Sequence, residues 1–473
     1  LGVNAYAFIV TNNGYVLVHP DLRPVFQGIL KPSYNSVDMT DVELMDDGQG
    51  PHNFSRKLLE FREKLVQGNI TSSISLPMKQ HFDNMKRVMR GTRFYYYKPI
   101  VDSPFTLVVS LPDHYGRFQV DAVVETHLLK SSKGKLNFFE GKSWKVHPDW
   151  FYCKYRMDTE ETQSFSSPED EIEHFFAKTQ SAGWNWPTRY QHDIQSNASA
   201  ASKSDKPGSK NKPYYCDRTL FLSLVFDAKV TSWFNKNVSA ASAEDKGNEF
   251  KQRFGLTLVF LATRSGLTRW QDFPYSSTRD EGASNLHFKD IHNKAIDEVW
   301  YKRAVEQNYE DPERFVYSVP FNSGILGSEV LDRNETLVTA ANAIFVENGD
   351  KKAPAAVVGF QFQHSALHNL FINITHSCPT TIGGNCKPTQ TCGSDSFECY
   401  VLDSNAYIIL SENKEHTGYF FGEVRGYVME QLVAENVYRR VHIYDYQGVC
   451  FISENQGSSR SNSLKNPLHY LSW

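Results

Sequence analysis

The sequence predicts an α+β protein in which antiparallel sheets are covered by helices. A hairpin pattern occurs three times, and after the first two copies a helical pattern and three strand-like runs follow in the same order. Aromatic residues make up 14% of the 473 residues, a content that suits a sheet-rich chain. Hydrophobic residues at 40% and charged residues at 22% are ordinary globular values, which excludes wholesale disorder.

Each hairpin pattern has an aromatic residue, a short apolar run, a polar turn with a small residue, and a second strand. The three copies are Phe8–Val18, Phe260–Trp270 and Tyr400–Leu410. In the first copy, Asn13 and Gly14 can adopt the positive φ angles of a tight turn. In the third copy Ala406 replaces glycine, so we expect Asn405 to supply the left-handed residue. The alternative is three unrelated hairpins in a sheet-rich protein.

The first hairpin is followed by an amphipathic helix and three strands. Apolar residues recur at helical spacing over 53–67, with Gly68 as a C-terminal cap and Asn53 as a possible N-cap. The strand-like runs are Ile74–Met78, Arg93–Tyr97 and Phe105–Leu111. Within Tyr95–Tyr97 the outer two rings should point to one face and the middle ring to the other, which favours sheet packing over an aromatic binding surface.

The second hairpin is followed by the same order of elements. A helix is predicted near 290–307, with Ile296, Val299 and Trp300 on one face. The strand-like runs that follow are Phe315–Pro320, Thr336–Val346 and Ala355–Phe362. Hairpin, helix and three strands is the order of a PAS-like half-domain. The third hairpin precedes a shorter version, with a helix near 427–436 and a strand at 441–444.

Two further segments lie between the first and second units. Pro168–Gly183 is predicted to be a helix, because Ser167 can cap it and Pro168 suits the first turn. Leu220–Phe234 is apolar on all sides, so periodicity does not separate a helix from a buried strand. Residues 197–213 are rich in Ser, Ala, Lys, Pro and Gly and indicate a flexible exposed insert.

Cysteine usage favours an extracellular or lumenal protein. Four of the seven cysteines are clustered, and the gaps of seven, five and six residues, with no histidine between them, favour disulfides over zinc. Cys153 and Cys216 flank the insert and form the best predicted pair. The clustered cysteines should pair among themselves in one of three connectivities, and the odd cysteine, Cys450, should have a partner outside the segment. The clustered cysteines are Cys378, Cys386, Cys392 and Cys399.

Six sequons for N-glycosylation agree with a secreted chain. They begin at Asn53, Asn69, Asn197, Asn237, Asn334 and Asn373. The net charge of −4 gives no bulk attraction for nucleic acid. No apolar run approaches the ~18 residues of a membrane helix, so we expect no direct membrane span. Residue 1 is not Met, and no signal-like segment opens the chain, which suggests a piece of a longer protein.

No motif for catalysis or metal binding is found. The sequence lacks a nucleophile elbow, a Walker loop, a dinucleotide fingerprint and a zincin motif, so we expect no enzyme. His364 and His368 have a spacing that could bind a metal, but no third ligand accompanies them, and we interpret them as helix-surface residues. His19-Pro20 and the acidic pair Asp46-Asp47 have structural readings, as a strand end and a solvated turn.

The sequence resembles the alpha-2/delta auxiliary subunit of voltage-gated calcium channels, and within that family the third paralogue group. No single matching segment is specific, but together they extend from near residue 1 to about 451. They are Ala5–Phe8, Thr11–Tyr15, His19–Leu22, Tyr34–Asp38, Ser103–Leu107, Leu261–Leu267, Phe315–Phe321, Gly418–Glu423 and Tyr444–Gln447, with Cys450 and the cysteine cluster. The insert at 197–213 departs from the family pattern.

The resemblance implies tandem Cache domains made of PAS-like half-domains. Residues 1–130 would be the membrane-proximal half of the first Cache pair, and 131–376 the second Cache region. Residues 377–452 would be a cysteine-rich segment with a final half-domain, and 453–473 a disordered tail. The von Willebrand A domain with its calcium-binding adhesion site would lie upstream and the membrane anchor downstream. No cofactor, metal or ligand residue is therefore transferred to this chain.

The function that the resemblance implies is regulatory. Such a subunit binds the pore-forming calcium-channel subunit on the extracellular face of the plasma membrane, raises its surface density and modulates its current. Two alternatives are a Cache-type sensor of small molecules such as amino acids, with Asp102 as a weak candidate for the ligand-binding acid, and a synaptic adhesion module. A secreted enzyme is the least supported reading, given the missing motifs.

Overall fold

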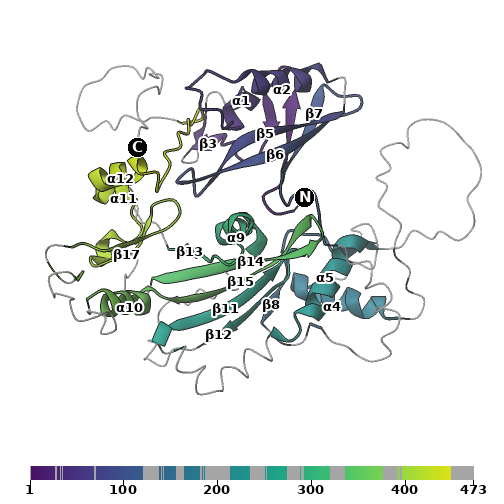
Figure 1. The fold of residues 1–473 in the computed structure, drawn as a ribbon. Helices are drawn as coiled ribbons and strands as arrows, with labels where there is room; N and C mark the ends of the chain where they lie inside the picture. Colours follow the sequence, from purple (N-terminus) through teal and green to yellow (C-terminus); the bar gives the residue numbers. More distant parts are fainter. Residues whose placement is uncertain are drawn as a thin grey trace, which may run out of the picture. The chain divides into compact units, whose positions relative to one another are not determined.

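The computed structural model divides the chain into two compact units (Figure 1). It describes residues 2–120, 138–155, 165–186, 214–234, 251–273, 288–319, 336–376 and 391–448, apart from short gaps inside these ranges. Unit 1 contains Leu1–Phe118, Ser404–Ala406 and Arg425–Trp473. Unit 2 contains Gln119–Asp403 and Tyr407–Val424.

Unit 1 is built on a five-stranded antiparallel sheet with the order β2-β1-β7-β6-β5. The strands are β1 (Tyr6–Thr11), β2 (Val16–Val18), β5 (Ser72–Phe82), β6 (Arg87–Pro99) and β7 (Phe105–Pro112), and a small separate hairpin pairs β3 (Val25–Phe26) with β4 (Ile29–Leu30). Tyr95 and Tyr97 are buried and Tyr96 is exposed, which confirms the predicted alternation.

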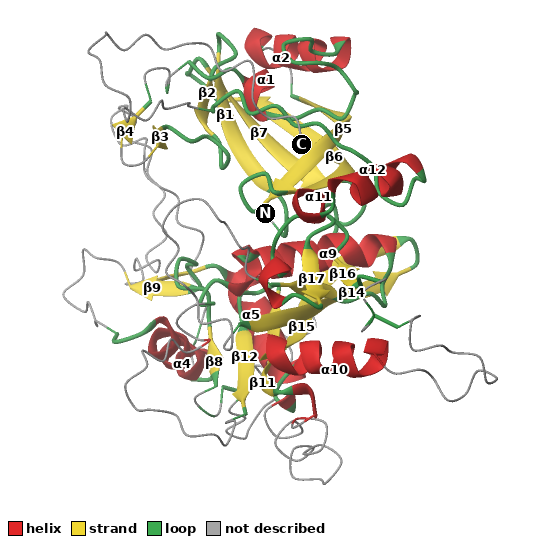
Figure 2. Cartoon of the chain, turned by 90° about the vertical axis from the view of Figure 1, so that its left-hand side faces the viewer, coloured by secondary structure: helices red, strands yellow, loops and turns green. Residues whose placement is uncertain are grey.

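Helices α1 (Met39–Val42) and α2 (Arg56–Gln67) lie beside this sheet (Figure 2) and supply most of the remaining core of unit 1. Leu58, Phe61 and Leu65 of α2 are fully buried against the sheet. Gly68 ends the helix at a φ of 59°, as predicted. The N-cap is Ser55 and not Asn53, because the Ser55 hydroxyl accepts the Leu58 N–H, whereas the Asn53 side chain bonds to Gln49.

Unit 2 repeats the strand order of unit 1 in a larger sheet. Its order is β13-β14-β15-β11-β12-β8. The hairpin β11–β12 and the later strands β13–β15 are arranged like the hairpin β1–β2 and the strands β5–β7 of unit 1, and β8 is added at one edge. The bounds are β8 (Trp144–Lys145), β11 (Leu256–Thr263), β12 (Thr268–Asp272), β13 (Val316–Ser318), β14 (Leu337–Asn348) and β15 (Lys351–Gln363). The predicted repeat and fold class are confirmed.

The helix of the second repeat begins later than predicted. A 3₁₀ turn, η1 (Ala295–Asp297), precedes α9 (Val299–Glu310), and Ile296 and Trp300 are buried while Val299 is partly buried. Trp300 packs against Phe260 of β11, with ring centroids 4.7 Å apart. The first turn of α9 therefore packs against the sheet.

A second core in unit 2 joins α4 (Pro168–Thr179), α5 (Arg218–Val230), β9 (Cys153–Tyr155) and β10 (Tyr214–Cys216). Ser167 caps α4 and Pro168 lies in its first turn, as predicted. The apolar run at 220–234, which periodicity left open, is helical over most of its length. Phe221, Leu224 and Val225 are buried because α5 packs within this core, whereas Val230 and Trp233 at its end are exposed.

The third hairpin is only a two-stranded sheet, β16 (Tyr400–Leu402) and β17 (Ile408–Ser411). Its left-handed residue is Ala406, with a φ of 61°, and not Asn405. Ala406 is buried at 1% exposure, whereas the Asn405 amide donates to the Val88 carbonyl, so the side chain of Asn405 is committed elsewhere.

Four helices surround the third hairpin in the sequence: α10 (His364–His376), η3 (Lys414–His416), α11 (Phe421–Val424) and α12 (Gly426–Ala434). The helix predicted at 427–436 is present as α12. The strand predicted at 441–444 is wrong, since these residues pair with no strand and contact unit 1 through side chains and single hydrogen bonds.

The division of the chain differs from the predicted domain boundaries. The segment expected at 377–452 is shared, because β16, β17 and α11 lie in unit 2 while the residues from 425 lie in unit 1. The first segment of unit 1 ends at Phe118, and the boundary expected at 130 lies outside the described residues. The insert at 197–213 and the tail at 453–473 lie outside the described residues.

Candidate functional site

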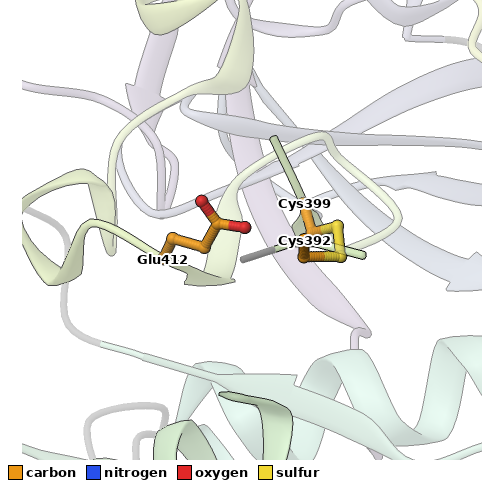
Figure 3. A group of neighbouring side chains, drawn as sticks. All are labelled: Cys392, Cys399 and Glu412. Carbon is orange, nitrogen blue, oxygen red and sulfur yellow. A yellow bond between two sulfur atoms is a disulfide. The ribbon is translucent and has the colours of Figure 1, made fainter. Parts of the chain in front are cut away.

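The cysteines of the described part form two disulfides. Cys153 pairs with Cys216, the pair expected from the sequence, across antiparallel partners of β9 and β10. Cys392 pairs with Cys399, and these two sulfurs lie beside a Glu412 carboxylate (Figure 3). Sulfur atoms bonded to each other are not thiolates, so this group does not offer a metal the ligands that it needs. Cys378, Cys386 and Cys450 lie outside the described residues.

Two of the six sequons fall on described residues. Asn53 is exposed before α2, and Asn373 is exposed on α10. Asn69, Asn197, Asn237 and Asn334 lie outside the described part. Asp102, the candidate for a ligand-binding acid, lies in the exposed turn between β6 and β7 with a φ of 57°, and it does not line the pocket described below.

The strongest concentration of buried polar groups in unit 1 surrounds Glu43, just after α1. Its carboxylate accepts hydrogen bonds from the hydroxyls of Tyr6, at 2.8 and 2.9 Å, and of Tyr95, at 2.6 Å. His19 Nε2 lies 3.0 Å from the same carboxylate, and Arg93 stacks over the Tyr6 ring at 4.6 Å. Strands β1 and β6 and the end of β2 therefore meet at one acidic side chain.

The donors around Glu43 keep it ionised. Burial alone would raise the pKa of Glu43, but the hydrogen bonds from His19, Tyr95 and Tyr6 outweigh it and hold the pKa below its ordinary value. Burial, reinforced by the Glu43 charge, raises the pKa of Tyr6 and of Tyr95. The hydroxyls thus remain protonated donors at neutral pH, and the cluster is a closed, satisfied network.

The His-Pro-Asp sequence at His19 recurs at His147, a repeat that the sequence analysis missed. In both copies the histidine Nδ1 accepts the backbone N–H two residues later, and Nε2 faces a distant carboxylate. That carboxylate is Glu43 in unit 1 and Asp297 in unit 2, where the hydrogen bond from His147 lowers the pKa of Asp297. Each histidine follows a strand at the edge of its sheet.

Unit 2 contains a buried arginine without a carboxylate partner in the described part. Arg269 of β12 is 2% exposed and donates to the carbonyls of Ala228 and Phe138 and to the Thr231 hydroxyl. Burial lowers the pKa of Arg269 to about 10. Ala228 and Thr231 lie at the C-terminal end of α5, where the helix dipole is negative, so the helix end stabilises the charge.

Within unit 1, the segment 441–448 contacts residues that are far from it in sequence. Lys79 donates to the His442 carbonyl at 2.8 Å, Arg23 pairs with Asp445, and the Tyr446 hydroxyl accepts the backbone N–H of His52. The same segment closes one side of a small pocket, whose other walls are residues 40–58 and Lys79. Because the partners are hundreds of residues apart, local patterns give no signal for this contact.

The two histidine–carboxylate pairs differ in their exposure. His19 and Glu43 are both buried, whereas the Asp297 side chain that pairs with His147 is 58% exposed. In both pairs the histidine Nδ1 is occupied by a backbone N–H group. None of the helices in the described ranges is both long and apolar enough to cross a membrane.

Comparison with known proteins decides the family. The model of the family described as "Neuronal voltage-dependent calcium channel alpha 2acd" matches residues 204–464, more than half of the chain. The chain belongs to the alpha-2/delta family of calcium-channel subunits. A second model, "CACHD1 middle domain", matches residues 5–112, which form most of unit 1.

Curated alpha-2/delta proteins are similar along the whole chain. The alpha-2/delta-3 subunit of Rattus norvegicus is 29% identical over 100% of this chain, and the alpha-2/delta-4 subunit of Homo sapiens is 29% identical over 99% of it. The calcium-channel protein unc-36 of Caenorhabditis elegans is 23% identical over 95% of the chain. The chain spans 38%, 36% and 36% of the length of these three relatives.

A solved structure also resembles part of the chain, weakly. The ligand-binding domain of the Pseudomonas aeruginosa amino-acid chemoreceptor PctC, in complex with GABA, is 12% identical and covers 43% of this chain and 77% of its own, with a TM-score of 0.20. That likeness is too low to inform the fold or the ligand of this alpha-2/delta chain.

Proposed function

We propose that this chain is part of an extracellular auxiliary subunit of a voltage-gated calcium channel, which raises the surface density of the pore-forming subunit and modulates its current. The observation that carries the proposal is the similarity to alpha-2/delta subunits along the entire chain, together with the family match over 204–464. The disulfides and exposed sequons support a route through the secretory pathway to the outer face of the plasma membrane.

The proposed role is binding without catalysis. Each unit has its own buried core and a twice-used sheet topology, so the chain offers stable surfaces to a partner. The pore-forming subunit is the partner that the family membership supports, and a calcium ion would be expected only at the adhesion site of an A domain outside this segment.

The test is calcium current in cells that express a pore-forming subunit with or without the full-length parent of this chain. Whole-cell current and surface labelling of the pore subunit would be measured together. Two variants of α2 assign the effect to unit 1: Phe61→Asp places a charge at a position with 0% exposure, and Leu59→Asp changes a position with 46% exposure on the same helix.

We expect the parent and its Leu59→Asp variant to raise current and surface density, and the Phe61→Asp variant to lose the effect. A parent that reaches the surface and leaves both quantities unchanged would refute the auxiliary-subunit role. In that case, calorimetric measurement of the binding of small amino acids to the purified chain would test the sensor alternative.

A further inference from the structure

Two histidines of α10 are buried against the third hairpin, although the sequence analysis placed them on a helix surface. His364 is 4% exposed and His368 is 7% exposed. They lie one turn apart, with ring centroids separated by 6.3 Å. His364 Nε2 lies 2.9 Å from the Ile409 carbonyl, and His368 Nε2 lies 3.1 Å from the Ser411 carbonyl. The two rings therefore join α10 to β17 by paired hydrogen bonds.

The hydrogen-bond partners fix the tautomer of both rings. A carbonyl oxygen only accepts, so each Nε2 carries the proton and each neutral ring leaves Nδ1 without one. Nδ1 of His368 is buried and has no hydrogen-bond partner. Protonation of His368 would add a charge and a second N–H donor to a buried ring whose Nδ1 makes no hydrogen bond, and both changes are costly.

The surrounding charges make protonation still less favourable. Lys414 of η3 faces both rings, and His376 at the end of α10 faces His368. Glu412 offers His368 only its backbone carbonyl, because its carboxylate lies beside the Cys392–Cys399 disulfide (Figure 3). Burial lowers the pKa of both histidines, and the charges of His368 and Lys414 lower the pKa of His364 further.

We propose that His364 and His368 form a pH-sensitive clasp, which holds the β16–β17 hairpin against α10 at neutral pH and releases it when both rings are protonated. In the opened hairpin both histidines have their ordinary pKa near 6.5, whereas in the closed hairpin their pKa is lower. The clasp is therefore fully stabilising above about pH 6.5 and weakens as the pH falls below it. Acidified compartments of the secretory and endocytic routes lie in this window.

The test is hydrogen–deuterium exchange of the full 473-residue chain at pH 7.5, 6.5 and 5.5, with exchange times scaled for the intrinsic pH dependence. The double variant His364→Gln/His368→Gln keeps an amide donor near each Nε2 position and does not titrate. The matched control is His376→Gln, which removes an exposed histidine from the same helix. Peptides from β5, β6 and β7 serve as an internal reference, because they belong to unit 1.

We expect protection of peptides within 400–424 to fall at least about threefold from pH 7.5 to pH 5.5 in the unaltered chain and in His376→Gln, since each pKa unit of mismatch corresponds to a tenfold change in the opening equilibrium. Protection in the double variant should stay constant, while the β5–β7 peptides stay constant in every protein. Unchanged protection of 400–424 in the unaltered chain would overturn the clasp. An equal pH response in the double variant would overturn it too.

Discussion

At the scale of single residues, this chain keeps buried charges by surrounding them with short-range partners. Glu43 has two tyrosine hydroxyls and a histidine within 3.0 Å. The buried Arg269 has the Ala228 carbonyl and the Thr231 hydroxyl at the end of α5. Removing such partners leaves an uncompensated charge, which costs more than the bonds contribute in place. These positions should therefore be sensitive to small chemical changes.

The first prediction concerns Glu43→Gln. The amide presents hydrogens to hydroxyl donors, so we expect the free energy of unfolding of unit 1 to fall by about 2–4 kcal/mol at pH 7. The measurement is urea unfolding followed by tryptophan and tyrosine fluorescence. Thr40→Ser, a conservative change of a neighbouring buried residue, is the matched control and should cost much less.

Glu43 also predicts a pH dependence. Its pKa is lower in the folded chain than its ordinary value of 4.5, so the unfolded chain binds the proton first as the pH falls. The stabilisation is complete above about pH 4.5 and is lost as the pH falls through the folded-state pKa. The Glu43→Gln variant should lack this part of the acid loss, and an identical acid profile for both proteins would contradict the assignment.

At the scale of elements, helix ends are decided by which side chain reaches the free N–H groups. Asn53 and Ser55 are both good capping residues, and sequence preference does not separate them. In the structure the Ser55 hydroxyl accepts the Leu58 N–H. The Asn53 amide is engaged by Gln49 in the preceding loop.

The second prediction follows from this cap. We expect Ser55→Ala to lower the free energy of unfolding by about 1 kcal/mol, because one N–H of the first turn loses its acceptor. Asn53→Ala should change it by less than about 0.5 kcal/mol. Chemical unfolding of the two variants under the same conditions decides between the caps, and a larger loss for Asn53→Ala would restore the sequence-based assignment.

At the scale of the whole molecule, one strand order occurs twice, and the two disulfides enclose loops of different length. The Cys153–Cys216 disulfide spans 63 residues, whereas Cys392–Cys399 spans 7. A longer closed loop removes more entropy from the unfolded chain. The long disulfide should therefore contribute more to stability, and only to the unit that contains it.

The third prediction is that Cys153→Ala/Cys216→Ala destabilises unit 2 by about 2–4 kcal/mol. Because the two units have separate cores, calorimetry should show the change in one unfolding transition and leave the transition of unit 1 in place. Cys392→Ala/Cys399→Ala is the control, and its effect should be smaller. Equal effects from both double variants would argue against the loop-entropy account.

The sequence alone determined what depends on neighbours along the chain. Hairpin turns, amphipathic helix faces and the alternation of Tyr95–Tyr97 are local patterns, and they predicted the repeated sheet, α2 and α4. The resemblance indicated the family for the same reason, since its motifs are short stretches read directly.

Tertiary structure decided the features that depend on residues distant in sequence. Ala406 takes the left-handed position because its hairpin is buried there, His364 and His368 are internal because β17 covers them, and the segment 441–448 binds unit 1 instead of forming a strand. Burial is a property of the assembled chain, so periodicity did not reveal that two polar residues on a helix face backbone carbonyls more than forty residues away. The same reason hid the Glu43 cluster, whose members come from four segments that only folding brings together.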